Sequence, residues 1–191
     1  IIITPFAICQ TQKATTESGG KVILNSDGTW AYVENKVDTA GADSSDCSNW
    51  IMTRTDEVTG EAHTSSIEKV IVSTDGGKSG FGIRMLLSSD NTLIMIIQAV
   101  GAGNCIDEGA KMNILFTDGT RLELFSDNDF NCEAEATIYF GGVFGKKLQL
   151  RELKSKKIKT MRVWTRDSYV QEDFTEENRI LFFNIINCLT K

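Results

Sequence analysis

Short apolar runs separated by turn residues dominate most of the chain. Asp-Gly occurs beside such runs at Asp27-Gly28, Asp75-Gly76 and Asp118-Gly119. Asp-Gly between apolar segments is a strong hairpin signal, because a type I′ turn needs positive φ at both central residues. The pattern predicts repeated hairpins, and it assigns Asp27 to a tight turn rather than to a binding loop.

Further runs rich in Ile, Val, Leu and Met have the length and composition of strands. Glycines punctuate the gaps between them, which is typical of an antiparallel meander. The run at 157–165 alternates imperfectly: Ile158, Thr160 and Arg162 fall on one side, and Lys159, Met161 and Val163 on the other. The predicted strands cover 69–73, 82–87, 93–100, 112–116, 122–125, 137–140, 147–153 and 157–165.

The end of the chain has the periodicity of a helix over 175–189. Thr175 is a candidate N-cap, and Glu176 and Glu177 suit the positive end of the helix dipole. Apolar residues at 182, 185, 186 and 189 form a stripe wide enough to pack against a sheet. We therefore expect a mainly β fold (β-rich α+β): an antiparallel, sandwich-like meander with one C-terminal helix packed on it.

The polar, small-residue stretch at 37–49 predicts a linker between an N-terminal β-hairpin (15–36) and a main β domain (50–191). The opening IIITPFAICQTQ is apolar and then polar, so residues 1–14 are interpreted as a signal-peptide remnant or disordered N-terminus, cut near Gln10. A lipid anchor at Cys9, or an ordinary strand broken by Pro5, are the alternatives. We favour export to the periplasm, the outer surface or the medium.

The net charge and the hydropathy of the chain argue against two kinds of partner, nucleic acid and a membrane that the chain would span. The net charge of −6 and pI of about 4.9 argue against nucleic acid, whose phosphates need clustered Lys and Arg. The most basic stretch, 146–159, is interpreted as the solvated face of strands. No run approaches the roughly 18 apolar residues of a membrane span.

Four cysteines remain when Cys9 is set aside, and an oxidising compartment permits two disulfides. A two-residue loop at Asp118-Gly119 pairs residues whose numbers sum to 237, and extending that register brings Cys105 opposite Cys132. This favours Cys105–Cys132 and leaves Cys47 for Cys188. Free buried thiols are the alternative.

No catalytic residue emerges from the sequence. His63 is the only histidine and lies in a polar stretch, and the chain has no CxxC pair, which argues against a zinc site of Cys/His type. Asp127, Asp129 and Asn131 are spaced like the start of an EF-hand loop, but the Gly and the final acid of such a loop are missing. A loose calcium site remains the candidate there, and no other cofactor is predicted. Aromatic residues could form a ligand-stacking platform if exposed: Trp30, Trp50, Trp164 and Tyr169.

TTESGGKVILNSDGTWAYV resembles the mature N-terminus of a group of small, uncharacterised exported β-rich proteins of Bacteroidetes-type bacteria. The tail IKTMRVWTRDSYVQEDFTEENRILFFNIINCL is similar to the C-terminal end of such proteins. The resemblance implies export and a β-rich fold and carries no activity. Its residues are Thr16, Ser18, Gly19, Lys21, Val22, Leu24, Asp27, Gly28, Thr29, Trp30 and Tyr32.

These observations predict a non-catalytic binding or structural module that meets a protein or glycan of the cell envelope. Two alternatives stay open. An extracellular glycan hydrolase would use two loop carboxylates, one of them with a raised pKa. A carrier of small apolar ligands would enclose an apolar pocket larger than about 300 Å³.

Overall fold

The computed structural model describes residues 12–15, 21–24, 29–32, 46–101, 103 and 105–191. The chain divides into two units, Ile1–Asp43 and Ser44–Lys191, and each is described by itself. Cys47–Asn49, a single 3-10 turn, belongs to the second unit rather than to a linker that ends at 49. Within the described residues, no helix has the length and hydrophobicity that crossing a bilayer requires.

The first unit contains a three-stranded antiparallel sheet where the sequence predicts a hairpin. Its strands are β1 (Gln12–Thr15), β2 (Lys21–Leu24) and β3 (Trp30–Tyr32). Leu24 pairs with Trp30, so five residues join β2 to β3 instead of the two of a type I′ turn. Residues 1–11 of the predicted signal remnant (1–14), the lipid-anchor candidate Cys9 and the turn residue Asp27 lie outside the described residues. Residues 12–14, predicted as part of that remnant, belong to the strand β1 instead.

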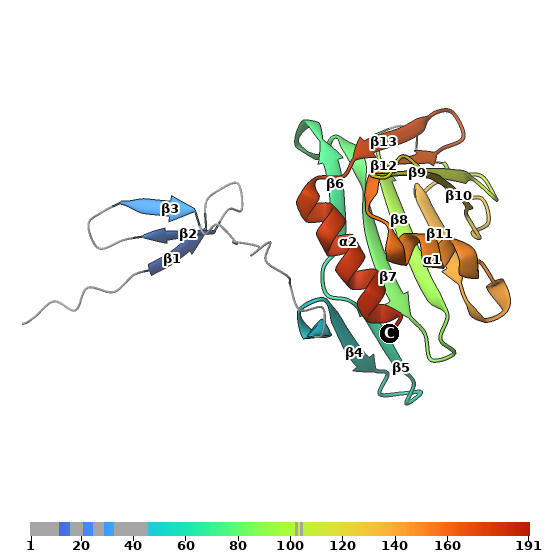
Figure 1. Ribbon diagram of the computed structural model, residues 1–191, viewed down its shortest axis with the longest axis horizontal. Coiled ribbons are helices and arrows are strands. Elements are labelled where there is room, and N and C mark those ends of the chain that lie inside the picture. Colours follow the sequence, from blue (N-terminus) through green and yellow to red (C-terminus); the bar gives the residue numbers. More distant parts are fainter. Residues whose placement is uncertain (1–11, 16–20, 25–28, 33–45, 102, 104) are drawn as a thin grey trace, which may run out of the picture. The chain divides into compact units, whose positions relative to one another are not determined.

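The second unit is built on two antiparallel sheets (Figure 1), which confirms the predicted mainly β fold. The six-stranded sheet has the order β11-β8-β7-β5-β4, with β6 also pairing β7. Its strands are β4 (Ile51–Thr55), β5 (Ala62–Ser66), β6 (Val70–Thr74), β7 (Ser79–Leu87), β8 (Leu93–Val100) and β11 (Glu135–Phe140). The four-stranded sheet, order β10-β9-β12-β13, comprises β9 (Lys111–Phe116), β10 (Arg121–Phe125), β12 (Ile158–Trp164) and β13 (Tyr169–Asp173).

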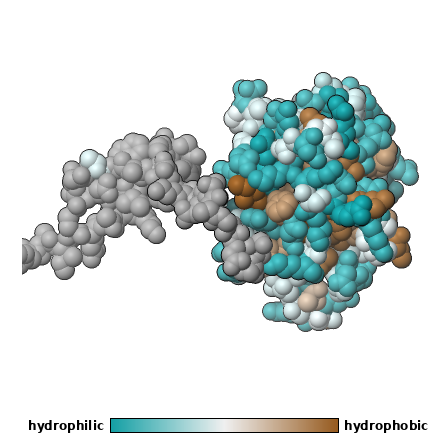
Figure 2. Space-filling view, viewed as in Figure 1, coloured by the Kyte–Doolittle hydropathy of each residue, from teal (hydrophilic) through white to brown (hydrophobic). Residues whose placement is uncertain are grey.

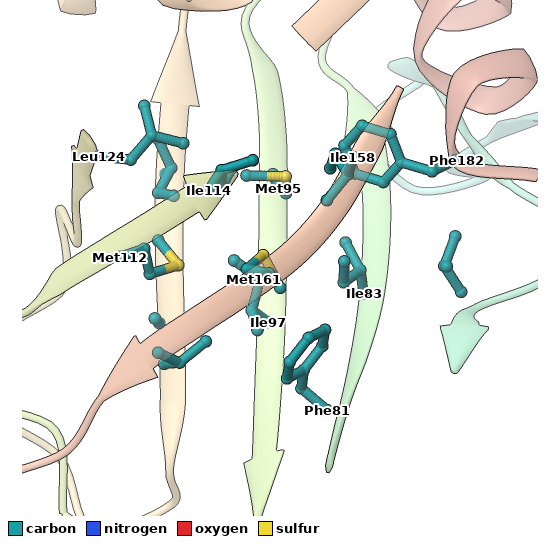
Figure 3. Close-up of a cluster of buried hydrophobic side chains, with 14 of the residues drawn as sticks. Phe81, Ile83, Met95, Ile97, Met112, Ile114, Leu124, Ile158, Met161 and Phe182 are labelled. Carbon is teal, nitrogen blue, oxygen red and sulfur yellow. The ribbon is translucent and has the colours of Figure 1, made fainter. Parts of the chain in front are cut away.

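The core lies between these sheets (Figure 3). Alternate residues of β8, including Met95 and Ile97, are buried and face Met112 and Met161 of the four-stranded sheet. The period of two along each strand puts one residue in and the next one out. The space between the sheets is therefore filled by side chains, and the outer face of each sheet is left to solvent.

The C-terminal helix α2 (Glu176–Leu189) lies over the six-stranded sheet, against β5, β6 and β7 (Figure 1). The backbone N–H of Asn178 donates to the Thr175 hydroxyl at 3.2 Å, which confirms the predicted N-cap. The predicted stripe is buried, and its members are Phe182, Ile185, Ile186 and Leu189. The face that carries α2 is mostly hydrophilic (Figure 2), as expected for a surface in contact with water.

The strand predicted at 147–153 is wrong, because this segment is the helix α1 (Lys147–Ser155). KLQLRELKS consists almost entirely of strong helix formers and contains no β-branched residue. Leu150 and Leu153 lie three apart and turn toward the core, with Leu153 fully buried, whereas Leu148 is exposed. Of the basic stretch 146–159, Lys147, Arg151 and Lys154 therefore lie on a helix and not on strands, whereas Lys159 lies exposed on β12.

The β9–β10 register also differs from the prediction. Leu122 pairs with Ile114 and Leu124 with Met112, so paired numbers sum to 236 instead of 237. The N–H of Phe116 donates to the Thr120 carbonyl at 3.0 Å, which leaves the three-residue loop 117–119. Gly119, with a φ of 83°, occupies the left-handed position that such a loop requires. The Asp-Gly signal thus located the hairpin, while the extra residue shifted every pair.

Both disulfides have the connectivity that the sequence favours, Cys47–Cys188 and Cys105–Cys132. The second pair is not aligned by the hairpin register. Ile106 and Asn131 form a separate antiparallel bridge, with reciprocal N–H to carbonyl bonds of 2.8 and 3.1 Å. The cysteines are the residues next to that hydrogen-bonded pair, and the neighbouring position in such a ladder is one where side chains approach closely.

The hydrophobic pattern does not predict three strands of the second unit, namely β4, β5 and β13. IMTRT and AHTSS are largely polar and exposed because β4 is an edge strand and β5 borders it. YVQED carries Glu172 on its inner face, where the carboxylate accepts hydrogen bonds from the Thr74 hydroxyl at 3.0 Å and the Ser79 hydroxyl at 2.9 Å. A buried carboxylate therefore joins the two sheets at a position where the pattern predicts an apolar residue.

Candidate functional site

The outer face of the four-stranded sheet carries a group of polar and aromatic side chains that come from all four strands. The strand register places its outward residues in three rows that cross β10, β9, β12 and β13. The first row is Arg121, Leu115, Thr160 and Asp173, and the second is Glu123, Asn113, Arg162 and Gln171. The third consists of two pairs, Phe125 with Lys111 and Trp164 with Tyr169.

A bulge in β12 gives this face its composition. The pairing of β12 with β9 shifts between Ile158 and Thr160, so Ile158 turns inward together with Met161 and Val163. Thr160, Arg162 and Trp164 then all point outward. The bulge explains why the alternation along 157–165 is imperfect in the sequence: the period of two is broken once, at Lys159.

Trp164 and Tyr169 are a directly opposed cross-strand pair. Their ring centroids lie 5.3 Å apart at an interplanar angle of 60°. Tyr169 is 43% exposed, whereas Trp164 is half-buried and its indole N–H donates to the Asn113 side-chain oxygen at 2.8 Å. The indole is therefore held in one orientation by a hydrogen bond, and the tyrosine beside it presents ring surface to solvent.

Arg162 lies beside these rings and is held by neutral groups. Its Nε and Nη2 both donate to the Gln171 side-chain oxygen, at 2.9 and 2.6 Å. Its guanidinium carbon is 4.2 Å from the Tyr169 ring centroid and 5.4 Å from that of Trp164. Among the residues that the structure describes, no carboxylate lies within 4.0 Å of this guanidinium group. The arginine is thus oriented by an amide and two rings, and its charge is not neutralised there.

A groove of about 530 Å³ lies next to the aromatic pair on the same face. Polar side chains from all four strands line the groove, and the apolar side chain of Leu115 lines it as well. One wall carries Glu123, whose carboxylate pairs with Lys111 at 3.1 Å and accepts a hydrogen bond from Asn113 at 3.2 Å. The polar groups in the lining are Asn113, Arg121, Glu123, Thr160, Arg162 and Gln171. We call this groove together with Trp164 and Tyr169 the aromatic–arginine surface.

Only one of the three tryptophans predicted to stack a ligand belongs to this surface. Trp50 is half-buried and packs against the hydrophobic core. Trp30 lies on β3 in the other unit, and its side chain is outside the described residues. Trp164 and its partner Tyr169 are brought together, while Asn113, Arg162 and Gln171 were missed. The available signal was the strand period, since Arg162 is two residues from Trp164 and Gln171 two from Tyr169.

A second groove, of about 410 Å³, lies on the outer face of the six-stranded sheet. Its floor is low because Gly80 and Gly82 of β7 have no side chains, and Ile71 and Val100 stand beside it, 61% and 50% exposed. Both grooves are open to solvent and lie on outer faces, whereas a carrier of apolar ligands needs an enclosed one. The interior between the sheets is already filled by the core.

The calcium candidates have other partners. Asp127 accepts a hydrogen bond from the Tyr139 backbone N–H at 2.8 Å and forms an ion pair with Lys146. The Asn131 side-chain oxygen accepts from two backbone N–H groups of its own turn, each at 3.2 Å, and Asp129 is exposed. Within the described ranges, no group of three or more His, Cys, Asp or Glu could hold a metal ion. These oxygens thus stabilise the turn before β11, and nothing in their arrangement adds support for calcium.

Loop carboxylates likewise organise their own turns. The Ser88 hydroxyl, followed by the amide and hydroxyl of Thr92, lowers the pKa of Asp90 below its usual value. The Thr120 hydroxyl and amide do the same for the pKa of Asp118. A glycosidase acid needs a raised pKa, which is the opposite shift. His63 is exposed on β5, opposite Arg54.

Comparison with known proteins adds no relative: no family model, no curated protein and no solved structure matches this chain. The resemblance to exported Bacteroidetes-type proteins therefore stays a prediction. The aromatic–arginine surface is the feature of the described residues from which a function can be inferred.

Proposed function

We propose that this protein is a non-catalytic, exported glycan-binding module and that the aromatic–arginine surface is its binding site. The observation that carries the proposal is the Trp164–Tyr169 pair set beside the amide and guanidinium groups of Gln171 and Arg162. A sugar ring offers an apolar C–H face and a rim of hydroxyls. An exposed aromatic ring suits the first, and fixed donors and acceptors suit the second.

The site is also pre-organised. Its side chains stand on paired strands, and hydrogen bonds fix several of them to one another. Trp164 donates to Asn113, and Arg162 donates to Gln171. A ligand that binds here loses little free energy to ordering the protein, because these rotamers are already restricted. A shallow, solvent-open groove suits a chain of sugars that extends beyond it.

Export is the second part of the proposal. Two disulfides are present, and such bonds persist in oxidising compartments outside the cytosol. The apolar opening of the chain and its resemblance to exported proteins point the same way. A partner in the cell envelope or the extracellular medium is then the expected encounter, and extracellular polysaccharide is abundant in both.

Affinity electrophoresis through gels that contain single soluble polysaccharides tests the proposal, with titration calorimetry for any polysaccharide that retards the protein. Tyr169→Ala should raise the dissociation constant about tenfold, as expected if a stacked ring contributes roughly 1.4 kcal/mol to binding. Tyr139→Ala is the matched control. Tyr139 also stands on the outer face of a sheet and also stacks on an aromatic neighbour, Phe144, with centroids 4.8 Å apart.

Both variants are first checked for an unchanged circular dichroism spectrum and melting temperature. A failure of the whole polysaccharide panel to retard the native protein would count against the proposal. So would an equal loss of affinity in the two tyrosine variants, because stacking at Tyr169 would then have no special part in binding.

A further inference from the structure

We propose that the aromatic–arginine surface selects acidic glycans, with the carboxylate of a uronic acid bound by Arg162 and Arg121. This inference rests on the proposed glycan-binding function and names its ligand class. Its starting point is a charge imbalance: the protein carries a net charge of −6, yet two arginines line the groove without an acidic partner among the described residues.

Arg162 is arranged as an anion receptor. A guanidinium group has five N–H donors, and Gln171 takes one from Nε and one from Nη2. The remaining donors include the pair at the end of the group, which matches the two oxygens of a carboxylate. Because the acceptor is a neutral amide, the full positive charge is available to a ligand. The group also packs against the Tyr169 ring, with its carbon 4.2 Å from the ring centroid.

Arg121 supplies a second charge at a useful distance. It lies on β10, two strands from Arg162, and one row along the sheet. Strand spacing and residue rise place the two α-carbons roughly 12 Å apart. Two extended arginine side chains can close most of that gap, so both can reach one sugar unit or two consecutive acidic units. Both line the same groove of about 530 Å³.

The acidic groups nearby do not cancel this charge. Among the described residues, Glu123 is ion-paired with Lys111. Asp173 keeps its charge while it accepts a hydrogen bond from the Thr160 hydroxyl at 2.5 Å, but it forms no ion pair with Arg121 or Arg162. The net negative charge of the protein acts at long range, where physiological salt screens it beyond about 8 Å. A glycan is favoured over an acidic peptide because the arginine adjoins ring surface and amides.

The test compares oligogalacturonate with the same oligomer fully methyl-esterified, which keeps the sugar backbone and removes its charge. Calorimetry should show at least tenfold tighter binding of the acid form. Arg162→Gln and Arg121→Gln should each reduce that preference severalfold, because each should cost the acid form more affinity than the ester. Arg84→Gln is the matched control, because Arg84 is an exposed strand arginine on the outer face of the other sheet.

The outcomes separate this inference from the function beneath it. Equal binding of acid and ester, with Arg162→Gln behaving like Arg84→Gln, would overturn acid selectivity and leave a neutral-glycan module standing. No binding of either oligomer or of any other glycan would overturn both. The inference would also be refuted if poly-glutamate bound as tightly as oligogalacturonate and if Tyr169→Ala did not affect that binding. The arginines would then bind any polyanion by charge alone.

Discussion

Gly80→Ala should destabilise the second unit strongly, whereas Gly82→Ala, two residues along the same strand, should not. Gly80 pairs with Ser73 of β6 and has a φ of 146°. A β-carbon at Gly80 would lie 2.3 Å from the Val72 carbonyl oxygen and 2.6 Å from the Ser73 α-carbon. Both contacts are with backbone, so no side-chain rotation can relieve them. At Gly82 nothing lies within 4 Å of the added atom.

The size of the effect follows from two terms. Forcing a non-glycine residue to positive φ costs about 1–2 kcal/mol, and overpacking typically costs about 1–3 kcal/mol. We expect Gly80→Ala to lower the free energy of unfolding by about 3 kcal/mol. The strain also falls beside the Glu172 carboxylate, whose hydrogen bonds from Thr74 and Ser79 join β13 to β6 and β7. Gly82→Ala should stay within about 0.5 kcal/mol.

Urea unfolding followed by circular dichroism measures both variants. Gly80→Ala should move the midpoint to lower urea with the m-value unchanged, and thermal unfolding should show a drop of roughly 6–12 °C for a unit of this size. If the two variants have midpoints that agree within error, the close approach of β6 and β7 at Gly80 is not as described and the reasoning fails.

The remaining predictions concern the disulfides and acid sensitivity. Replacing Cys47 and Cys188 by alanine should lower the free energy of unfolding by about 5 kcal/mol, and replacing Cys105 and Cys132 should lower it by about 3.6 kcal/mol. The difference arises because the two disulfides close loops with sequence separations of 141 and 27 residues. Urea titrations that reverse this order would contradict the loop-entropy argument. The pKa of Asp118 is lowered in the folded state, mainly by the hydroxyl and then the amide of the threonine two residues on, so its contribution to stability is present above its ordinary pKa and lost as pH falls through the folded one. Asp118→Asn should therefore show a smaller fall in melting temperature between pH 4 and pH 2 than the native protein, and an identical fall would refute the assignment.

The parts of the fold that the sequence predicts are those where a local pattern has one strong interpretation. The helix at 175–189 has a cap, two N-terminal acids and a wide apolar stripe, and all three appear in α2. The runs at 93–100 and 69–73 are nearly continuous apolar segments with β-branched residues, and they form β8 and most of β6. Here local propensity and tertiary packing favour the same structure.

Prediction fails where neighbours in space outweigh the local pattern. Residues 147–153 have an apolar spacing compatible with a strand, but their helix propensity and the contact of Leu153 with the core make α1. YVQED is an unpromising strand until β12 supplies its partner and two hydroxyls stabilise Glu172 inside. One extra loop residue at Gly119 shifts the register of β9 and β10.

The candidate site divides in the same way. The sequence alone identifies Trp164 and Tyr169 as aromatic residues of interest and marks Arg162 as one of the alternating residues of 157–165. It does not say that these three share a face with Asn113, about fifty residues earlier, because that depends on which strands pair and in which register. The groove exists only once β9, β10, β12 and β13 are aligned.

By itself, then, the sequence determined the class of fold and the C-terminal helix, because hydrophobic period and capping residues act locally. It also favoured the disulfide connectivity that the structure shows, although the hairpin register behind that choice was off by one residue. Only the tertiary structure decided the two-sheet arrangement, the bulge at Lys159 and the meeting of aromatic rings with unneutralised arginines. The physical reason is that a strand's side-chain direction has a period of two, so a single bulge or one-residue slip reassigns every side chain to the opposite face.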